Sequence, residues 1–137
     1  MRFIILPLLS VIFLQAQVKR DNDTVFDTKT NLYWQDDRSA KSVMKKFKDA
    51  IVYCEDLTLS GYDDWRLPSI KELQSITDSK EQNPTIIKGF DNCASNYYWS
   101  STEHMDIPKR AWFISFDNGY KYSYHQNRSY YVRCVRD

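Results

Sequence analysis

The stretch from Gly61 to Leu73, GYDDWRLPSIKEL, carries several strong conformational signals within a few residues. Gly61 accepts a positive φ and is predicted to end a preceding helix. Pro68 forces the residue before it towards an extended conformation. Ser69 and Glu72, three positions apart, form a capping box, in which both side chains accept backbone N–H groups at a helix start. The stretch therefore predicts a turn, a short extended segment and a helix start, in that order.

Three of the four tryptophans, Trp65, Trp99 and Trp112, lie in strand-like runs close to motif residues. Trp65 alternates with Leu67, and alternate residues of an extended segment point to the same side. Trp99 and Trp112 lie among apolar neighbours in the C-terminal third. Because large aromatic side chains in such runs are mostly buried, we expect all three tryptophans to pack in the core. A role as site residues is the alternative.

The first 16 residues have the features of a secretory signal peptide. Arg2 gives a basic start, residues 3–14 are largely apolar, and Ala16 is a small residue of the kind found before a cleavage point. The apolar run is short for a bilayer span, which argues against an uncleaved anchor. We therefore predict export to the periplasm or the cell surface, with residues 17–137 forming one domain that has no membrane span.

Charge in the predicted mature chain is balanced. Arg2 leaves with the signal peptide, and the remaining 18 basic residues equal the 18 acidic ones in number. Nucleic-acid binding depends on neutralising phosphates with an excess of basic side chains. The balanced net charge therefore argues against a nucleic-acid partner. A balanced total is still compatible with local charged patches on the surface.

Three cysteines in an oxidising compartment predict one disulfide and one free thiol, with three pairings open at this point. The spacing gives no metal motif, because Cys-x-x-Cys is absent and His104 and His125 lie apart in the sequence. Calcium ligands would have to come from Asp91, Asp106 or Asp117, but the Glu-Pro-Asn and Trp-Asn-Asp patterns of sugar-binding lectins are absent. We expect neither a metal nor a cofactor.

Predicted strands surround two predicted helices, which makes the fold class α+β. Residues 17–24 are polar and are expected to be frayed. The predicted elements are strands at 24–27 and 31–35, helices at 43–59 and 70–78, and strands at 97–101, 111–116, 120–125 and 130–135. Asp117-Asn118-Gly119 is a hairpin signal, so the last four strands are predicted to form an antiparallel meander. Lys41, Lys45 and Lys48 are expected on the solvated side of the first helix; an anion patch is the alternative.

Several of these stretches resemble one known family. They are Asn31 to Gln35, Asp64 to Leu73, Tyr98 to Thr102 and Val132 to Arg136. Their aromatic-rich motifs, in this order, are similar to those of the bacterial domain typified by the C-terminal domain of the Legionella collagen-like adhesin. The resemblance covers about Thr24 to Arg136.

This resemblance implies a C-type-lectin-like α+β fold, in which the N- and C-terminal strands meet and two helices flank a mixed, largely antiparallel sheet. It also implies an exported or cell-surface protein. In the collagen-like adhesin, the domain is associated with sulfated glycosaminoglycans and with trimers. This chain has no collagen repeat, and its mature charge is balanced. In C-type-lectin-like domains a first-helix cysteine commonly pairs with one in the last strand, so the resemblance implies a disulfide between Cys54 and Cys134 that leaves Cys93 free.

The polar residues of the motifs are expected to fix the fold rather than to react. Arg66 and Arg133 are predicted to pair with an internal acid such as Asp64 or Glu72; gripping a carboxylate ligand is the alternative. Ser100 and the hydroxyls that follow it are expected to close loop hydrogen bonds, because no histidine is tied to them by a known motif. The structural motif residues are Trp65, Arg66, Pro68, Glu72, Trp99, Ser100 and Arg133.

The predicted binding surface combines residues 103–110 with residues 120–128. Three tyrosines are expected on one strand face, with basic side chains in nearby loops. The candidates are Lys109, Arg110, Tyr120, Tyr122, Tyr124, His125 and Arg128. Flat aromatic rings beside hydrogen-bonding groups suit sugars or peptides. A tyrosine row that merely covers the sheet is the alternative.

We therefore expect an exported binding module that recognises a glycan or an envelope protein. A structural envelope component without a small ligand is one alternative. Another is an enzyme, by analogy with the formylglycine-generating enzymes that share the implied fold. That chemistry needs a reactive cysteine pair, and only Cys93 would be spare here. No enzymatic activity is expected.

Overall fold

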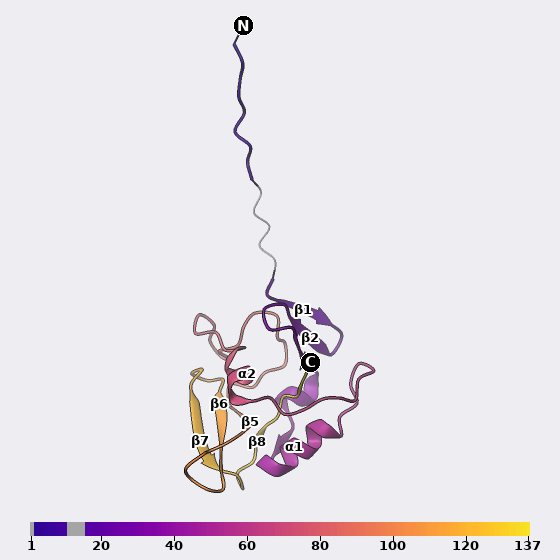
Figure 1. Ribbon diagram of the computed structural model, residues 1–137, viewed down its shortest axis with the longest axis vertical. Helices are drawn as coiled ribbons and strands as arrows, with labels where there is room; N and C mark the ends of the chain where they lie inside the picture. Colours follow the sequence, from indigo (N-terminus) through magenta and orange to yellow (C-terminus); the bar gives the residue numbers. More distant parts are fainter. Residues whose placement is uncertain (1, 11–15) are drawn as a thin grey trace.

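The computed structural model describes residues 2–10 and 16–137, and its folded body is an α+β domain with two sheets and two α-helices (Figure 1). Residues 2–10 have no regular secondary structure and lie outside this body. Residues 1 and 11–15 of the predicted signal peptide are outside the described part of the chain. Among the described residues, no helix is long and apolar enough to cross a membrane.

The four-stranded sheet brings the two ends of the folded body together. Its order is β1 (Val18–Asp21), β2 (Thr24–Asp27), β3 (Leu32–Gln35) and β9 (Val135–Arg136), with antiparallel neighbours. Asn31 has a left-handed conformation, with φ 60°, in the turn before β3. The prediction of frayed residues at 17–24 was wrong. Strand β1 pairs with β2 along its whole length, because Val18 is buried in the core and anchors it.

The five-stranded sheet contains most of the C-terminal third. Its order is β4 (Met44–Lys45), β8 (Tyr130–Tyr131), β5 (Tyr97–Glu103), β6 (Arg110–Ser115) and β7 (Lys121–His125). The hairpin between β6 and β7 confirms the turn signal, and Gly119 has φ 82° there. Strands β5, β6 and β7 form the predicted antiparallel meander.

The final predicted strand, 130–135, was wrong as one continuous element. Its first part, β8, lies between β4 and β5 and runs parallel to β5. Its last part, β9, joins the other sheet beside β3. Between them the backbone exchanges hydrogen bonds with Gln35: Cys134 N–H donates to the Gln35 side chain at 3.0 Å, and Gln35 N–H donates to the Cys134 carbonyl at 2.9 Å. This short segment therefore connects the two sheets.

Both helices are shorter than predicted. Helix α1 covers Phe47–Glu55, because Met44 and Lys45 before it pair with β8 as a strand. Gly61 has the expected positive φ, 81°, but it lies with Ser60, φ 53°, in a tight turn rather than at a helix end. Helix α2 covers Ile70–Gln74 and begins with the predicted capping box. The chain leaves the helix after Gln74 to pair Thr77 with Ile86.

Core residues pack on both faces of the five-stranded sheet. Tyr98 and Ile114 pack in one cluster with Leu73 of α2, whereas Trp99 and Phe113 pack in the other with Phe47 of α1. Successive strand residues point to opposite faces, so the two helices lie on opposite sides of this sheet. This arrangement, with the chain ends joined in the smaller sheet, is compatible with a C-type-lectin-like fold.

Candidate functional site

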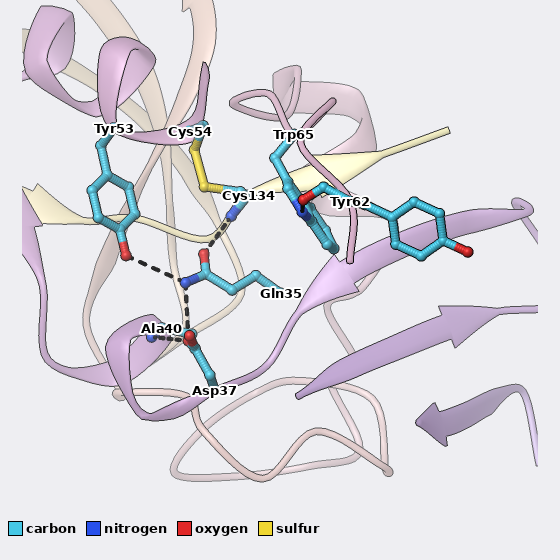
Figure 2. Close-up of a disulfide and its surroundings, with 8 residues drawn as sticks. All are labelled: Gln35, Asp37, Ala40, Tyr53, Cys54, Tyr62, Trp65 and Cys134. Carbon is cyan, nitrogen blue, oxygen red and sulfur yellow. Dashed lines mark hydrogen bonds between the residues drawn. A yellow bond between two sulfur atoms is a disulfide. The ribbon is translucent and has the colours of Figure 1, made fainter. Parts of the chain in front are cut away.

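The disulfide between Cys54 and Cys134 confirms the predicted pairing and fastens α1 to the segment between the sheets (Figure 2). The two Cα atoms are 5.5 Å apart, and both residues are fully buried. Gln35 lies beside the bond, and its amide nitrogen donates to Asp37 at 2.9 Å and to the Tyr53 hydroxyl at 3.4 Å. Cys93 is the one cysteine with a free thiol, and burial raises the pKa of that thiol.

Arg66 pairs with Glu72, one of the two acids predicted for it. Its two terminal nitrogens donate to the two carboxylate oxygens at 2.6 and 2.7 Å, the fork geometry that arginine favours. These hydrogen bonds hold the pKa of Glu72 below its usual value, although partial burial opposes the shift. Glu72 also closes the capping box, so the arginine fixes the start of α2. Asp64 instead pairs with Arg136 at 2.6 Å.

Arg133 pairs with an internal acid as predicted, but this acid is Asp36 rather than Asp64 or Glu72. Arg133 Nη1 lies 3.0 Å from Asp36 Oδ1, and both side chains have 0% exposure. Burial opposes ionisation of Asp36, but the charge of Arg133 and hydrogen bonds from the backbone and from Arg20 bring the pKa of Asp36 below its usual value. Asp36 follows β3 directly, in the segment between the predicted strand at 31–35 and the first predicted helix.

Two of the three tryptophans are core residues as expected. Trp65 and Trp99 are 2% and 0% exposed, and their ring nitrogens donate to backbone carbonyls. Trp112 is only half-buried, so the expectation was wrong for this residue. Its ring stacks on His104 with centroids 5.3 Å apart, and the Lys121 ammonium lies 5.4 Å from its ring centroid.

Hydroxyl groups in β5 close hydrogen bonds as predicted. Ser100 Oγ donates to the Trp112 carbonyl at 2.7 Å, and Thr102 Oγ1 accepts the Ile70 N–H at 2.9 Å. The Pro68 carbonyl accepts the N–H of Ser101 at 2.7 Å. These contacts fasten the start of α2 to β5. The motif residues therefore position this helix, and the Ser100 and Thr102 hydroxyls are engaged in hydrogen bonds.

A hollow of about 330 Å³ lies on the α1 side of the five-stranded sheet, towards its β7 edge. We call it the tyrosine face. It is lined by Tyr97, Phe113, Tyr122, Ser123, Tyr124, Arg128 and Tyr130. The pairing of Phe113 with Tyr122 across β6 and β7 places Tyr122 and Tyr124 on the same side of the sheet. Two of the predicted tyrosines therefore meet in one concavity.

The rings of the tyrosine face are held in place by their neighbours. The Tyr122 hydroxyl accepts from the Asn118 side chain at 2.8 Å. The guanidinium carbons of Arg110 and Arg128 lie 5.7 and 5.1 Å from the Tyr124 ring centroid. Burial raises the pKa of Tyr130 above its usual value. The surface thus offers flat aromatic faces edged by two cationic groups.

A second hollow, of about 300 Å³, lies where the turn after β7 meets the start of α1. We call it the lysine hollow. It is lined by Lys46, Lys48, Asp49, Lys109, His125, Gln126 and Asn127. Gln126 connects the turn after β7 to the loop before β6, because its backbone N–H donates to the Lys109 carbonyl at 2.9 Å. Three lysine ammonium groups against one carboxylate make this hollow a favourable place for anionic groups.

The structure divides the predicted site residues between these two hollows. Tyr122, Tyr124 and Arg128 line the tyrosine face, and Lys109 and His125 line the lysine hollow. Arg110 lines neither, but it supports Tyr124 and donates to the Ser123 carbonyl at 2.7 Å. Tyr120 belongs to neither hollow: it lies in the turn before β7 and is 67% exposed. Within the described residues, no group of three or more histidines, cysteines or acids is placed to hold a metal ion.

Six lining residues lie outside the predicted ranges 103–110 and 120–128: Tyr97, Phe113, Tyr130, Lys46, Lys48 and Asp49. Phe113 was predictable, because the hairpin turn sets the register that places it opposite Tyr122. Tyr97 and Tyr130 meet through the parallel pairing of β5 and β8, which had no sequence signal. Lys46 and Lys48 approach the β7 turn through a tertiary contact, in which Phe47 N–H donates to the Gln126 carbonyl at 3.1 Å.

Comparison with known proteins finds a protein family whose model matches most of this chain. The family model of the Lcl C-terminal domain matches residues 23–136 of the chain. That span contains both sheets except β1, both helices, the disulfide and both hollows. A search among curated proteins finds no match to the chain.

Proposed function

The chain belongs to the Lcl C-terminal domain family, and from this membership and the surface described above we propose that it is an exported module that binds a glycan in the bacterial envelope or at the cell surface. The family associates the chain with cell-surface adhesins. The observation that carries the proposal is the tyrosine face, a preformed aromatic concavity edged by arginines.

Aromatic side chains and polar groups have separate roles in such binding. The exposed faces of Tyr122 and Tyr124, 41% and 43% exposed, suit the apolar side of a sugar ring. Arg128 and the tyrosine hydroxyls supply hydrogen bonds that orient a ligand. Because neighbours already hold Tyr122 and Tyr124, little side-chain entropy is lost on binding.

The lysine hollow supplies charge beside the aromatic surface. His125 lies at the end of β7, close in sequence to Tyr124, so one extended chain could contact both hollows. An acidic or sulfated sugar chain would place its rings on the tyrosines and its charged groups near Lys46 and Lys109. Binding that uses these exposed lysines should weaken as salt is added.

A protein partner in the envelope is the second candidate. Tyrosine and arginine are the residues that most often dominate the energetics of protein interfaces, and both concentrate on the tyrosine face. Strand β7 is also an edge of its sheet, where a partner strand could add. A structural envelope component that binds no small ligand is the outcome if neither glycan nor protein partner engages this surface.

The proposed role is binding rather than catalysis. Cys54 and Cys134 form a disulfide, so either could join Cys93 in a reactive pair only after that bond is reduced. The remaining thiol, Cys93, has a pKa raised by burial, which disfavours the nucleophilic thiolate. The buried disulfide is itself suited to an oxidising compartment, in line with the proposed export by an N-terminal signal peptide.

A glycan array tests this proposal. The purified protein would be applied at two salt concentrations, with and without calcium, beside Tyr122→Ala and the matched control Tyr120→Ala. We expect selective, saturable binding that Tyr122→Ala weakens at least tenfold and Tyr120→Ala leaves unchanged. A blank array would contradict the glycan proposal and favour a protein partner. Equal binding by both variants would place the site elsewhere on the molecule.

A further inference from the structure

A third cavity, apart from the tyrosine face and the lysine hollow, lies on the four-stranded sheet. We call it the sheet cleft. It encloses about 160 Å³ between the sheet and the turn that carries Tyr62. Its aromatic walls are Phe26, Tyr33, Tyr62 and Trp65, and Lys19 and Asp21 lie at its rim.

Strand register explains why these side chains converge. Lys19, Phe26 and Tyr33 lie directly opposite one another on β1, β2 and β3, and Arg136 of β9 extends the row. Residues opposite one another in a sheet point to the same face. Asp21 is two residues after Lys19 in β1, so it shares that face. The cleft is therefore built into the sheet rather than into a loop.

The opposite wall is equally fixed. Tyr62 lies over β3 beside Trp65, whose ring nitrogen donates to the Tyr62 carbonyl at 3.1 Å (Figure 2). The Arg136 guanidinium lies 3.7 Å from the Tyr62 ring centroid and 5.0 Å from that of Tyr33. Asp64 neutralises that guanidinium at 2.6 Å. Arg136 thus acts as part of the wall and supports both tyrosine rings.

Size and charge limit what fits the cleft. A cavity of about 150 Å³ holds one six-membered ring such as benzene, and the sheet cleft is of that size. Its charged groups balance, because Lys19 and Asp21 carry opposite charges on the same face of β1 and Arg136 is paired with Asp64. Asp21 would repel a sulfate or carboxylate group. A polar rim above aromatic walls favours a ring that has an apolar face and hydroxyl groups at its edge.

We propose that the sheet cleft is a second binding site, which takes a single uncharged pyranose ring. The ring packs against Tyr62 and Phe26. The Asp21 carboxylate accepts hydrogen bonds from its hydroxyls, and the Lys19 ammonium donates to its oxygens. The site is separate from the tyrosine face and does not depend on the function proposed for that surface.

Saturation-transfer difference NMR with free methyl glycosides tests the site. The probes are the methyl pyranosides of glucose, galactose, mannose and N-acetylglucosamine, with N-acetyltryptophanamide as an aromatic comparison and glucuronic acid as a charged one. We expect transfer to at least one uncharged glycoside. Its affinity should fall at least fivefold in Asp21→Asn and at least tenfold in Tyr62→Ala, whereas Tyr120→Ala leaves it unchanged.

Three outcomes would overturn the proposal. Transfer to N-acetyltryptophanamide but to no glycoside would show that the cleft takes an aromatic peptide side chain. Preference for glucuronic acid would contradict the inferred charge selection. Glycoside binding that Tyr122→Ala removes and Asp21→Asn spares would assign the sugar to the tyrosine face instead. Because the cleft and tyrosine-face variants are separate, failure of one site is distinguishable from failure of the other.

Discussion

Among single residues, the buried pair of Arg133 and Asp36 connects segments that lie 97 residues apart in the chain. Arg133 lies between β8 and β9, and Asp36 follows β3. The guanidinium also contacts the Asn92 carbonyl and lies 4.9 Å from the Phe90 ring centroid. The Asp36 carboxylate accepts N–H groups from the same loop, at 91 and 92. One ion pair thus holds the long loop before β5 against both sheets.

Arg133→Met should lower the free energy of unfolding by about 3 kcal/mol or more, because it leaves the Asp36 carboxylate buried without its main partner. Urea denaturation monitored by tryptophan fluorescence measures this loss. The matched control is Lys88→Met, which removes an exposed pair with Glu81 and should change stability by less than about 0.5 kcal/mol. Similar small losses in both variants would contradict the role given to Arg133.

Stability should fall as the solution is acidified. Asp36 and Glu72 have pKa values lowered in the folded protein, so their stabilising contributions are complete above their unfolded values, about 4, and are lost as the pH falls through the folded values. Urea midpoints between pH 7 and pH 2 should therefore decrease below about pH 4. Glu72→Gln should show a shallower decrease than the wild type. An equally steep decrease in this variant would contradict the contribution assigned to Glu72.

Sequence reasoning at this scale succeeded where partners are close in sequence. Ser69 and Glu72 are three residues apart, and their capping box is present as predicted. Arg66 and Glu72 lie six residues apart and form the predicted ion pair. Arg133 and its acid are 97 residues apart, and nothing local distinguishes Asp36 from the chain's other exposed-looking acids. Such a pair depends on the folded topology, which the sequence patterns left open.

At the scale of elements, α2 is a helix of five residues and depends on its ends. Its first turn is closed by the Ser69 hydroxyl, which accepts the Glu72 N–H at 3.1 Å, and by Thr102, which accepts the Ile70 N–H. So short a helix gains little from its own backbone bonds. The capping contacts and the burial of Leu73 therefore determine its position.

Ser69→Ala should cost about 1 kcal/mol of stability, since it removes the side chain that caps α2. Ser129→Ala, an exposed serine in the turn before β8, is the matched control and should be nearly neutral. Thermal unfolding by circular dichroism compares the two. If Ser129→Ala were as destabilising as Ser69→Ala, the cap would not be the cause of the loss.

Element types were more predictable than element limits. Both helices and most strands were expected, because apolar periodicity and turn residues are local signals. The first helix was predicted to begin too early, since Met44 and Lys45 form a strand that pairs with β8 near the C-terminal end of the chain. The splitting of residues 130–135 between two sheets was missed for the same reason. In each case, pairing between strands that are far apart in the sequence outweighed the local pattern of apolar residues.

For the whole molecule, the disulfide joins α1 to the segment that connects the two sheets. It spans 80 residues, so it restricts the unfolded chain strongly. The chain-entropy model gives about 4 kcal/mol for a loop of this length. The bond and the Arg133 pair lie on neighbouring residues, which concentrates long-range constraints at one point of the fold.

The variant Cys54→Ala with Cys134→Ala should lose about 4 kcal/mol of unfolding free energy, plus a small cost for the removed sulfur atoms. Chemical denaturation without reductant gives the value, with Cys93→Ala as the control that keeps the disulfide. Adding a reductant should lower the stability of the wild type and of Cys93→Ala, but not that of the double variant. A stable double variant would show that the packed sheets alone maintain the fold.

The central claim is that the tyrosine face is the binding surface of this family member. Cosedimentation with bacterial envelope fragments, untreated, protease-treated or periodate-treated, tests it most directly. We predict that the wild type and Tyr120→Ala cosediment, that Tyr122→Ala does not, and that periodate but not protease abolishes binding. Equal cosedimentation of Tyr122→Ala and Tyr120→Ala would contradict the claim, and binding lost only after protease treatment would replace the glycan with a protein partner.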